Sequence, residues 1–178
     1  MNTTDIEKNN RENFRYLLDT LSMPGTIKTV HKLFDSYTLA VASVLLYSEV
    51  SYLNTTEEDF SIIDAITNSQ ITTMEKTDYL FCDNLENILE VIKKGTHLNP
   101  DYSCTIIFLC DSFEGEEIIL RGPGINNKRI ETYPINKEFI ESFNNNNESY
   151  PLGNEIFFLN KTTGQIKSLC RTTKLEVA

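Results

Sequence analysis

The chain has 178 residues, of which 40% are hydrophobic and 24% are charged, so we expect a single domain over residues 1–178, with residues 1–9 flexible. The formal net charge of -10 disfavours partners with phosphate backbones or anionic membrane surfaces, so neither nucleic acid nor membrane binding is expected. MNTTDIEKNN has no basic region before an apolar core, and residues 39–47 are too short an apolar run to cross a bilayer. We therefore expect a cytoplasmic protein.

The first predicted helix ends at residues 23–25, Met-Pro-Gly. Before this point, four apolar residues recur with the spacing of one helix face: Phe14, Leu17, Leu18 and Leu21. Pro24 lacks a backbone donor and disfavours helical dihedrals at Met23, while Gly25 tolerates dihedrals that other residues avoid. The sequence thus predicts an amphipathic helix followed by a fixed corner that orients the chain toward a sheet.

Two further helices and a short strand are predicted in the first half of the chain. Ser36 is a candidate N-cap for a helix that continues to about residue 48 and is apolar nearly all round. Residues 49–53 alternate like a strand. Thr55 and Glu58 form a capping-box pattern, which predicts a helix that runs to about Asn68.

The second half alternates between strand and helix patterns. Residues 78–82 predict a strand, and Asp83 with Glu86 predicts the start of a helix that ends at Gly95. Residues 103–110 are almost continuously apolar, which predicts a central strand covered on both faces. Residues 117–121 are predicted to be the hairpin partner of that strand.

The remaining segments complete a mixed α/β pattern. Asn136 is a candidate cap for a helix that carries three apolar residues, and residues 144–147, four asparagines, predict a loop. Residues 155–159 and 165–169 predict a hairpin closed by the turn between them. No internal repeat or linker composition divides the chain.

The cysteines and histidines do not form a recognisable site. The four cysteines include no C-x-x-C pair and no nearby histidine, so neither a metal site nor a redox motif is indicated. Cys104 and Cys110 are expected on one face of a strand as small apolar fillers. The two histidines, His31 and His97, accompany no G-x-S-x-G elbow, which gives a serine hydrolase little support.

Three short segments combine backbone-shaping residues with hydrogen-bonding groups: 121–125 (RGPGI), 150–155 (YPLGNE) and 171–173 (RTT). Glycines after a strand allow close approach, consecutive amides can form an anion-binding concavity, and arginines bind phosphate or carboxylate in bidentate fashion. None of the segments fits the Walker or dinucleotide glycine patterns, and each is also explained as an ordinary turn. The candidate binding residues are Arg121, Gly122, Gly124, Glu155, Arg171 and Thr172.

Taken together, these segments resemble one known family. An N-F-R-x-L-L-D-x-L-S-x-P-G run occupies residues 13–25, and the segments LRGPGI, YPLG and RTT follow in the order and spacing of that family. Over roughly residues 10–177 the chain resembles PhnH, a subunit of the bacterial carbon-phosphorus lyase complex. Two departures are visible: the family's aspartate after an apolar residue is replaced by Asn154-Glu155, and Cys170 stands where a proline usually precedes the arginine.

The resemblance implies a fold and partners. It implies an α/β protein similar to pyridoxal-phosphate-dependent transferases, with a mixed sheet between helical layers but without the cofactor. It also implies a homodimer when the protein is isolated, and assembly with the sister subunits G, I and J. Most of the lysines, which include for instance Lys93, Lys128 and Lys161, are expected at helix ends or in polar turns and not in an apolar pocket, which agrees with the absence of Schiff-base chemistry.

The resemblance also implies a function. The family supports, with subunits G and I, the reaction in which an alkylphosphonate displaces adenine from the ribose of ATP. Three hypotheses remain open for this chain: an accessory subunit that shapes the assembly, a subunit with its own phosphonate or nucleotide site, and a residual pyridoxal-phosphate enzyme. The first predicts that the glycines and prolines fix backbone shape and that an apolar face is kept for partners.

Overall fold

The structure is a computed structural model that describes residues 3–178, and α1 includes residues 3–9. The helices are α1 (Thr3–Ser22), α2 (Tyr37–Leu45), α3 (Ser61–Thr67), α4 (Ile88–Val91), the 3-10 helix η1 (Pro100–Tyr102) and α5 (Lys137–Asn146). The strands are β1 (Lys28–Thr29), β2 (Ser51–Asn54), β3 (Gln70–Ile71), β4 (Tyr79–Cys82), β5 (Thr105–Cys110), β6 (Glu116–Arg121), β7 (Arg129–Tyr133), β8 (Glu155–Asn160), β9 (Gln165–Leu169) and β10 (Lys174–Val177).

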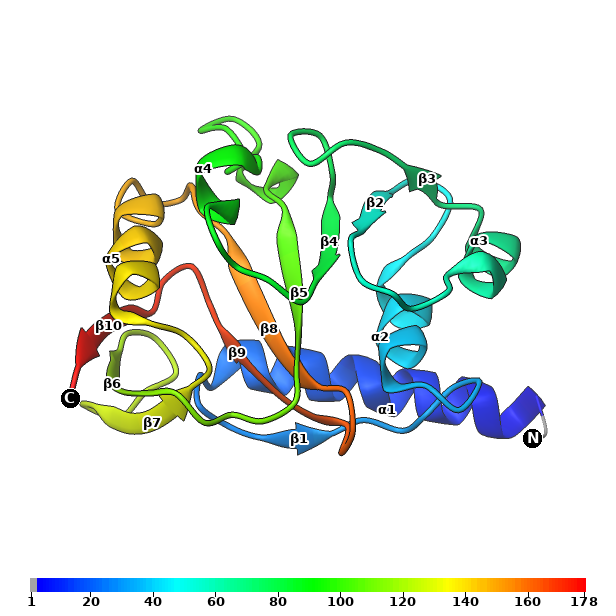
Figure 1. The fold of residues 1–178 in the computed structure, drawn as a ribbon, viewed down its shortest axis with the longest axis horizontal. Coiled ribbons are helices and arrows are strands. Elements are labelled where there is room, and N and C mark those ends of the chain that lie inside the picture. Colours follow the sequence, from blue (N-terminus) through cyan, green and yellow to red (C-terminus); the bar gives the residue numbers. More distant parts are fainter. Residues whose placement is uncertain (1–2) are drawn as a thin grey trace.

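A mixed seven-stranded sheet forms the centre of the molecule (Figure 1). Its strand order is β1-β9-β8-β5-β4-β2-β3, and β8, β5, β4, β2 and β3 are parallel to their neighbours in this series. The strand β9 is antiparallel to both β8 and β1. The β8–β9 hairpin predicted from the sequence is therefore confirmed, and so is the mixed α/β class.

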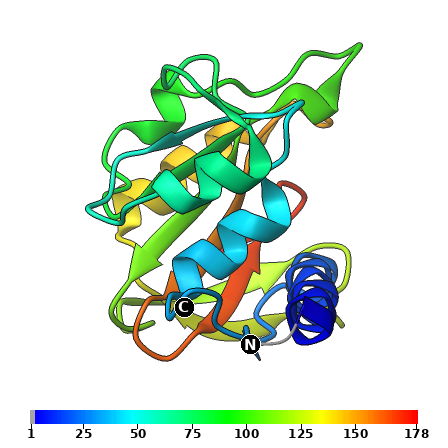
Figure 2. The same ribbon diagram turned by 90° about the vertical axis from the view of Figure 1, so that its right-hand side faces the viewer.

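Both faces of the central strands are buried, because alternate residues of each strand enter different cores. In β8, Ile156 and Phe158 join one core with α4 and α5, while Phe157 and Leu159 join another with α1, α2 and α3. The strand β5 divides in the same way and lies at the centre of the sheet, as its apolar run predicts. Figure 2 shows α1 and α2 beside the sheet in the perpendicular view.

A separate three-stranded antiparallel sheet, in the order β10-β6-β7, covers part of the core that contains α5. Ile118 and Leu120 of β6 and Leu175 of β10 are buried in that core. The prediction that residues 117–121 pair with β5 in a hairpin is wrong, since the neighbours of β5 are β4 and β8. The turn at Gly115 instead leads β6 out of the central sheet.

The first helix ends at Ser22, as the Met-Pro-Gly corner predicts, but its buried face differs from the predicted apolar stripe. Leu17 is buried, whereas Phe14 and Leu18 are each 47% exposed. The buried face instead includes Asn13, whose side chain donates to the carbonyl of His31 and accepts from its backbone amide. This polar pair holds α1 against the segment before α2.

Two helices begin later than predicted. Thr55 and Glu58 do not cap α3; instead the Asn54 side chain accepts from Thr56 and donates to the carbonyl of Glu58, which holds these residues in a turn. The helix predicted from Asp83 is reduced to α4, because Asn87 adopts left-handed dihedrals immediately before it. In both cases a local asparagine turn replaces the predicted first helical turn.

The two other predicted caps are confirmed. Ser36 accepts a hydrogen bond from the amide of Leu39, and Asn136 accepts one from the amide of Phe139. The predicted loop at residues 144–147 is wrong, because α5 continues through Asn146. These asparagines are retained within the fold by hydrogen bonds that are described below.

The thiols of Cys82, Cys104 and Cys110 are buried and unpaired by disulfides. Burial raises the pKa of Cys104 and of Cys110 to about 12, so these thiols stay protonated as apolar fillers, as predicted. Within residues 3–178, no helix combines the length and apolar character that a membrane crossing requires.

One lysine is enclosed in the core, and the sequence did not single it out. The Lys167 side chain of β9 donates to the carbonyl of Thr132, and its nitrogen lies 3.9 Å from the ring centre of Tyr133 and 4.5 Å from that of Phe113. The residue is 2% exposed. Burial lowers the pKa of Lys167 to about 8.

This burial predicts a distinctive dependence of stability on pH. The folded chain loses the Lys167 proton near pH 8, whereas the ordinary lysine value is 10.5, so between these values the unfolded chain binds more protons. Stability from this group therefore rises with pH in that interval. We expect the melting temperature of the wild type, measured relative to Lys167→Met, to increase from pH 8 to pH 10. The same comparison with Lys161→Met, at an exposed position, should show no such trend. If the difference in melting temperature between the wild type and Lys167→Met did not change with pH, the lowered pKa of Lys167 would be contradicted.

Candidate functional site

The RGPGI segment lies against two other segments that the sequence analysis identified, the corner after α1 and the RTT segment. A Cβ atom added at Gly124 would lie 1.9 Å from the carbonyl oxygen of Ser22, at the end of α1. One added at Gly122 would lie 2.7 Å from the carbonyl oxygen of Thr172. Both glycines have positive φ, 79° and 140° respectively. The RGPGI segment therefore fits between the corner after α1 and the RTT segment because its glycines lack side chains.

Arg171 connects the RTT segment to the YPLGNE segment. Its Nε donates to Glu155 Oε1 at 3.1 Å. Its Nη1 donates to the carbonyls of Pro100 and Pro151, at 2.9 and 3.2 Å, and its Nη2 donates to Ser103 Oγ at 3.0 Å. One guanidinium thus holds together the start of β8, the end of β9 and the segment before β5. We call Arg171 with these partners the arginine clamp.

The clamp is mostly withdrawn from solvent. The Arg171 and Glu155 side chains are 15% and 22% exposed. The charges are close enough to neutralise each other, and most of the guanidinium donors point at protein oxygens. As placed, these groups act as a cross-link between segments.

The remaining predicted binding residues are placed differently. Thr172 donates its hydroxyl to Cys170 Sγ at 3.5 Å, so it too is engaged within the chain. Arg121, at the end of β6, lies 3.3 Å from Glu176 of β10, with the two side chains 42% and 54% exposed. The structure thus brings Gly122, Thr172, Arg171 and Glu155 into one series of contacts, and gives Arg121 a separate surface ion pair.

Asn154, which sequence reasoning noted only as a departure from the family pattern, is a fully buried hub. Its Nδ2 donates to the carbonyls of Cys104 and Lys93, at 2.7 and 2.9 Å. Its Oδ1 accepts from Asn146, and its backbone amide donates to Asn147. The signal that could have found it is the neighbouring run of asparagines, which supplies two of its partners.

Replacing Asn154 tests this hub. Asn154→Leu removes one hydrogen-bond partner from each of the carbonyls of Cys104 and Lys93 and from the side-chain amide of Asn146. We expect the free energy of unfolding to fall by about 3 kcal/mol, measured by urea denaturation. Asn145→Leu, an exposed position in the same asparagine run, is the matched control and should change it by less than about 0.5 kcal/mol. Equal losses of unfolding free energy for the two variants would contradict a stabilising role for the buried hydrogen bonds of Asn154.

A second polar group reinforces the same edge of the sheet. Asp78 accepts hydrogen bonds from Lys93 and from the backbone and hydroxyl of Ser51. Burial opposes ionisation of this carboxyl, but the hydrogen bonds from Lys93 and Ser51 outweigh it and hold the pKa of Asp78 below its usual value. Asp78 therefore remains a structural anion that joins β2, β4 and the segment after α4.

Three carboxylates that lie next to strands, Asp83, Asp111 and Glu155, do not gather into one site. Glu155 begins β8, whereas Asp83 and Asp111 follow the carboxyl ends of β4 and β5. Asp111 is paired with Lys161 at 3.2 Å. Of the two histidines, His31 lies 2.8 Å from Glu12, and His97 is exposed in the loop after α4. This arrangement does not support a paired-carboxylate or serine-histidine mechanism.

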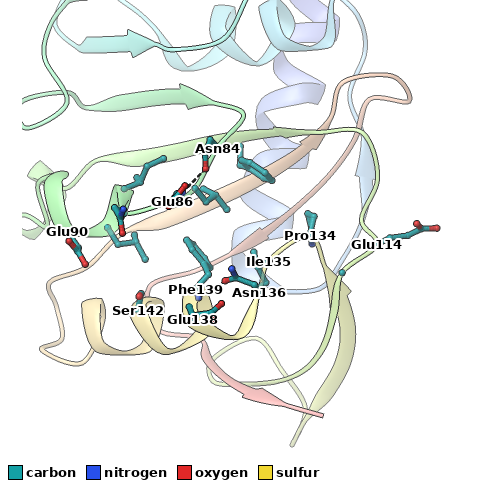
Figure 3. Close-up of a pocket in the computed structure, with 16 residues that line it drawn as sticks. Asn84, Glu86, Glu90, Glu114, Pro134, Ile135, Asn136, Glu138, Phe139 and Ser142 are labelled. Carbon is teal, nitrogen blue, oxygen red and sulfur yellow. Dashed lines mark hydrogen bonds between the residues drawn. The ribbon is translucent and has the colours of Figure 1, made fainter.

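A large groove lies elsewhere, between α4, α5 and the turn from β5 to β6 (Figure 3). Its volume is about 860 Å³, and none of the six predicted binding residues lines it. Its rim carries Glu86, Glu90, Glu114 and Glu138, while no lysine, arginine or histidine is among its lining residues. Such a rim repels anionic ligands, so the groove does not suit a phosphonate or a nucleotide.

Comparison with models of known families identifies a match over nearly the whole chain. The model of the family described as "Bacterial phosphonate metabolism protein (PhnH)" matches residues 3–176. None of the curated proteins that were compared with the chain matches it. The family match covers α1 and the three candidate segments.

Proposed function

Since the chain belongs to the PhnH family of bacterial phosphonate metabolism proteins, as the resemblance predicted, we propose that it is an accessory subunit of the carbon-phosphorus lyase system. In this role it supports subunits G and I in forming alkylphosphonate ribose triphosphate from ATP and an alkylphosphonate. The whole chain acts as one domain. The observation that supports the proposal is the arginine clamp, in which Arg171 and Glu155 of two family segments bind each other and other protein groups.

The chemistry of the clamp favours a shaping role over a catalytic one. A catalytic or anion-binding arginine needs donors that are free to meet the ligand. Arg171 directs its donors to Glu155, two carbonyls and Ser103, and Thr172 donates to Cys170. The glycines of the RGPGI segment contact backbone atoms of α1 and of the RTT segment. These residues therefore fix the shape of a surface that other subunits recognise.

The proposed partners are subunits G, I and J in the assembly and a second copy of this chain when it is isolated. Unburied apolar side chains on and after α1 support a contact of this kind. Phe14 and Leu18, one helical turn apart, are each 47% exposed, and Met23 and Ile27 are each 43% exposed. Exposed apolar side chains of this kind support the partner-facing surface that the accessory hypothesis expects.

We propose further that the fold is that of pyridoxal-phosphate-dependent transferases, used here without the cofactor. The mixed seven-stranded sheet between two helical cores supports this likeness. The most buried lysine does not fit Schiff-base formation, since the Lys167 amine is enclosed by two rings and the Thr132 carbonyl, and the residue is 2% exposed. Incubation with pyridoxal phosphate should leave the protein without the visible absorbance of an aldimine.

Adenine release tests the function directly. Purified subunits G and I with this chain should convert ATP and methylphosphonate with release of adenine, and omission of this chain should abolish the reaction. The isolated chain should release no adenine. If it turned over by itself, or if its omission left the rate unchanged, the accessory role would be wrong.

Calorimetry separates this role from a subunit with its own ligand site. Titration of ATP or methylphosphonate into the isolated chain should give no heat of binding. A binding isotherm that disappears in Arg121→Ala or in Arg171→Ala would favour a direct contribution instead.

A further inference from the structure

We propose that the groove between α4, α5 and the β5–β6 turn docks a partner-protein segment that carries apolar and basic side chains. This inference rests on the proposed accessory role and names the chemistry of one contact within it. The groove is separate from the arginine clamp and from the exposed apolar residues of α1.

The floor of the groove is apolar. It is formed by residues that also belong to, or pack against, the core with α4 and α5: Leu85, Ile88, Leu89, Phe108, Ile135 and Phe139. Among these, Leu85 and Phe108 are only partly buried, so apolar surface remains available at the bottom of the groove. A partner's apolar side chain would remove this surface from water.

The rim has a single sign of charge. Glu86, Glu90, Glu114 and Glu138 are all exposed, and they come from three separate parts of the chain that line the groove. In Figure 3 the Glu114 side chain points away from the other lining residues. No salt bridge involves any of the four among the residues that the structure describes. Lysine or arginine side chains of a partner would complement this rim and would steer the encounter.

Two stretches of the chain supply most of the groove's lining residues, one within 84–90 and the other within 134–142. A partner segment with apolar side chains toward the floor and basic side chains toward both walls would complement the apolar floor and the acidic rim at once. The groove lies near the carboxyl ends of β4 and β5, and this end of a parallel sheet commonly presents binding surfaces.

Fluorescence anisotropy on the intact isolated chain tests the groove. The probe is a labelled synthetic peptide that arranges leucine and lysine as an amphipathic helix. We expect it to bind at low salt, and to bind about tenfold more weakly to the Glu86→Lys/Glu90→Lys variant. Peptides with glutamate in place of lysine, or serine in place of leucine, should not bind.

The matched control is Glu117→Lys/Glu141→Lys, which makes the same change in net charge at exposed positions that do not line the groove. It should bind like the wild type, apart from a small change caused by net charge. Equal weakening in both double variants, binding of the glutamate peptide, or absence of wild-type binding would overturn the inference. Because the assay uses the isolated chain, such a failure leaves the accessory role intact, whereas failure of the adenine-release test would reject that role independently of the peptide result.

Discussion

Arg171→Met should lower the free energy of unfolding by about 3 kcal/mol in urea denaturation. Methionine retains much of the side chain's apolar volume but removes the charge and the donors. Glu155 is then a largely buried carboxylate without its partner, and the carbonyls of Pro100 and Pro151 lose a hydrogen bond. Arg171→Lys should recover little of the loss, because one ammonium group cannot reach acceptors arranged around a planar guanidinium.

Arg121→Met is the control for this result. It removes the same functional group from another family segment, but the ion pair with Glu176 is solvent-exposed. Exposed pairs contribute little, so the expected change is within about 0.5 kcal/mol. Similar losses for Arg121→Met and Arg171→Met would show that the clamp has no special structural role.

Gly124→Ala should lower the free energy of unfolding by about 3 kcal/mol or more, and the melting temperature by about 10 °C. The added Cβ would lie 1.9 Å from the Ser22 carbonyl oxygen, and the φ of 79° is itself unfavourable for alanine. Because the obstacle is backbone and not a flexible side chain, the corner after α1 or the RGPGI segment must move.

Asn126→Ala provides the comparison for Gly124→Ala. Asn126 is exposed in the same loop, and its side chain makes no hydrogen bond within residues 3–178, so its replacement should shift the melting temperature by less than about 2 °C. Thermal unfolding followed by circular dichroism measures both. If Gly124→Ala melted like the wild type, the contact between α1 and the RGPGI segment would not be constrained as described.

Sequence reasoning succeeded where the determining interactions are local. Ser36 and Asn136 cap their helices through amides three residues ahead, and the β8–β9 hairpin closes over a short turn. The same reasoning failed where residues distant in sequence decide the structure. The strand β6 leaves the central sheet because it pairs with β7 and β10, and no pattern within residues 117–121 specifies those partners.

The candidate site was predictable as a set of residues but not as an arrangement. Glu155 and Arg171 were both identified, yet their pairing depends on the register of β8 and β9, which places Ile156 opposite Leu169. Asn154 escaped notice as a functional hub because its acceptors are backbone carbonyls near β5 and after α4, which side-chain patterns do not reveal. The family resemblance supplied the proposed function, and the clamp gives the contacts that Arg171 and Glu155 of its segments make in this fold.

Co-expression with subunits G, I and J, followed by size-exclusion chromatography and native mass spectrometry, tests the central proposal most directly. We expect the chain to elute with these subunits in a fixed stoichiometry. If the folded chain eluted alone and the sister subunits assembled without it, the proposal that this chain is an accessory subunit of their complex would be contradicted.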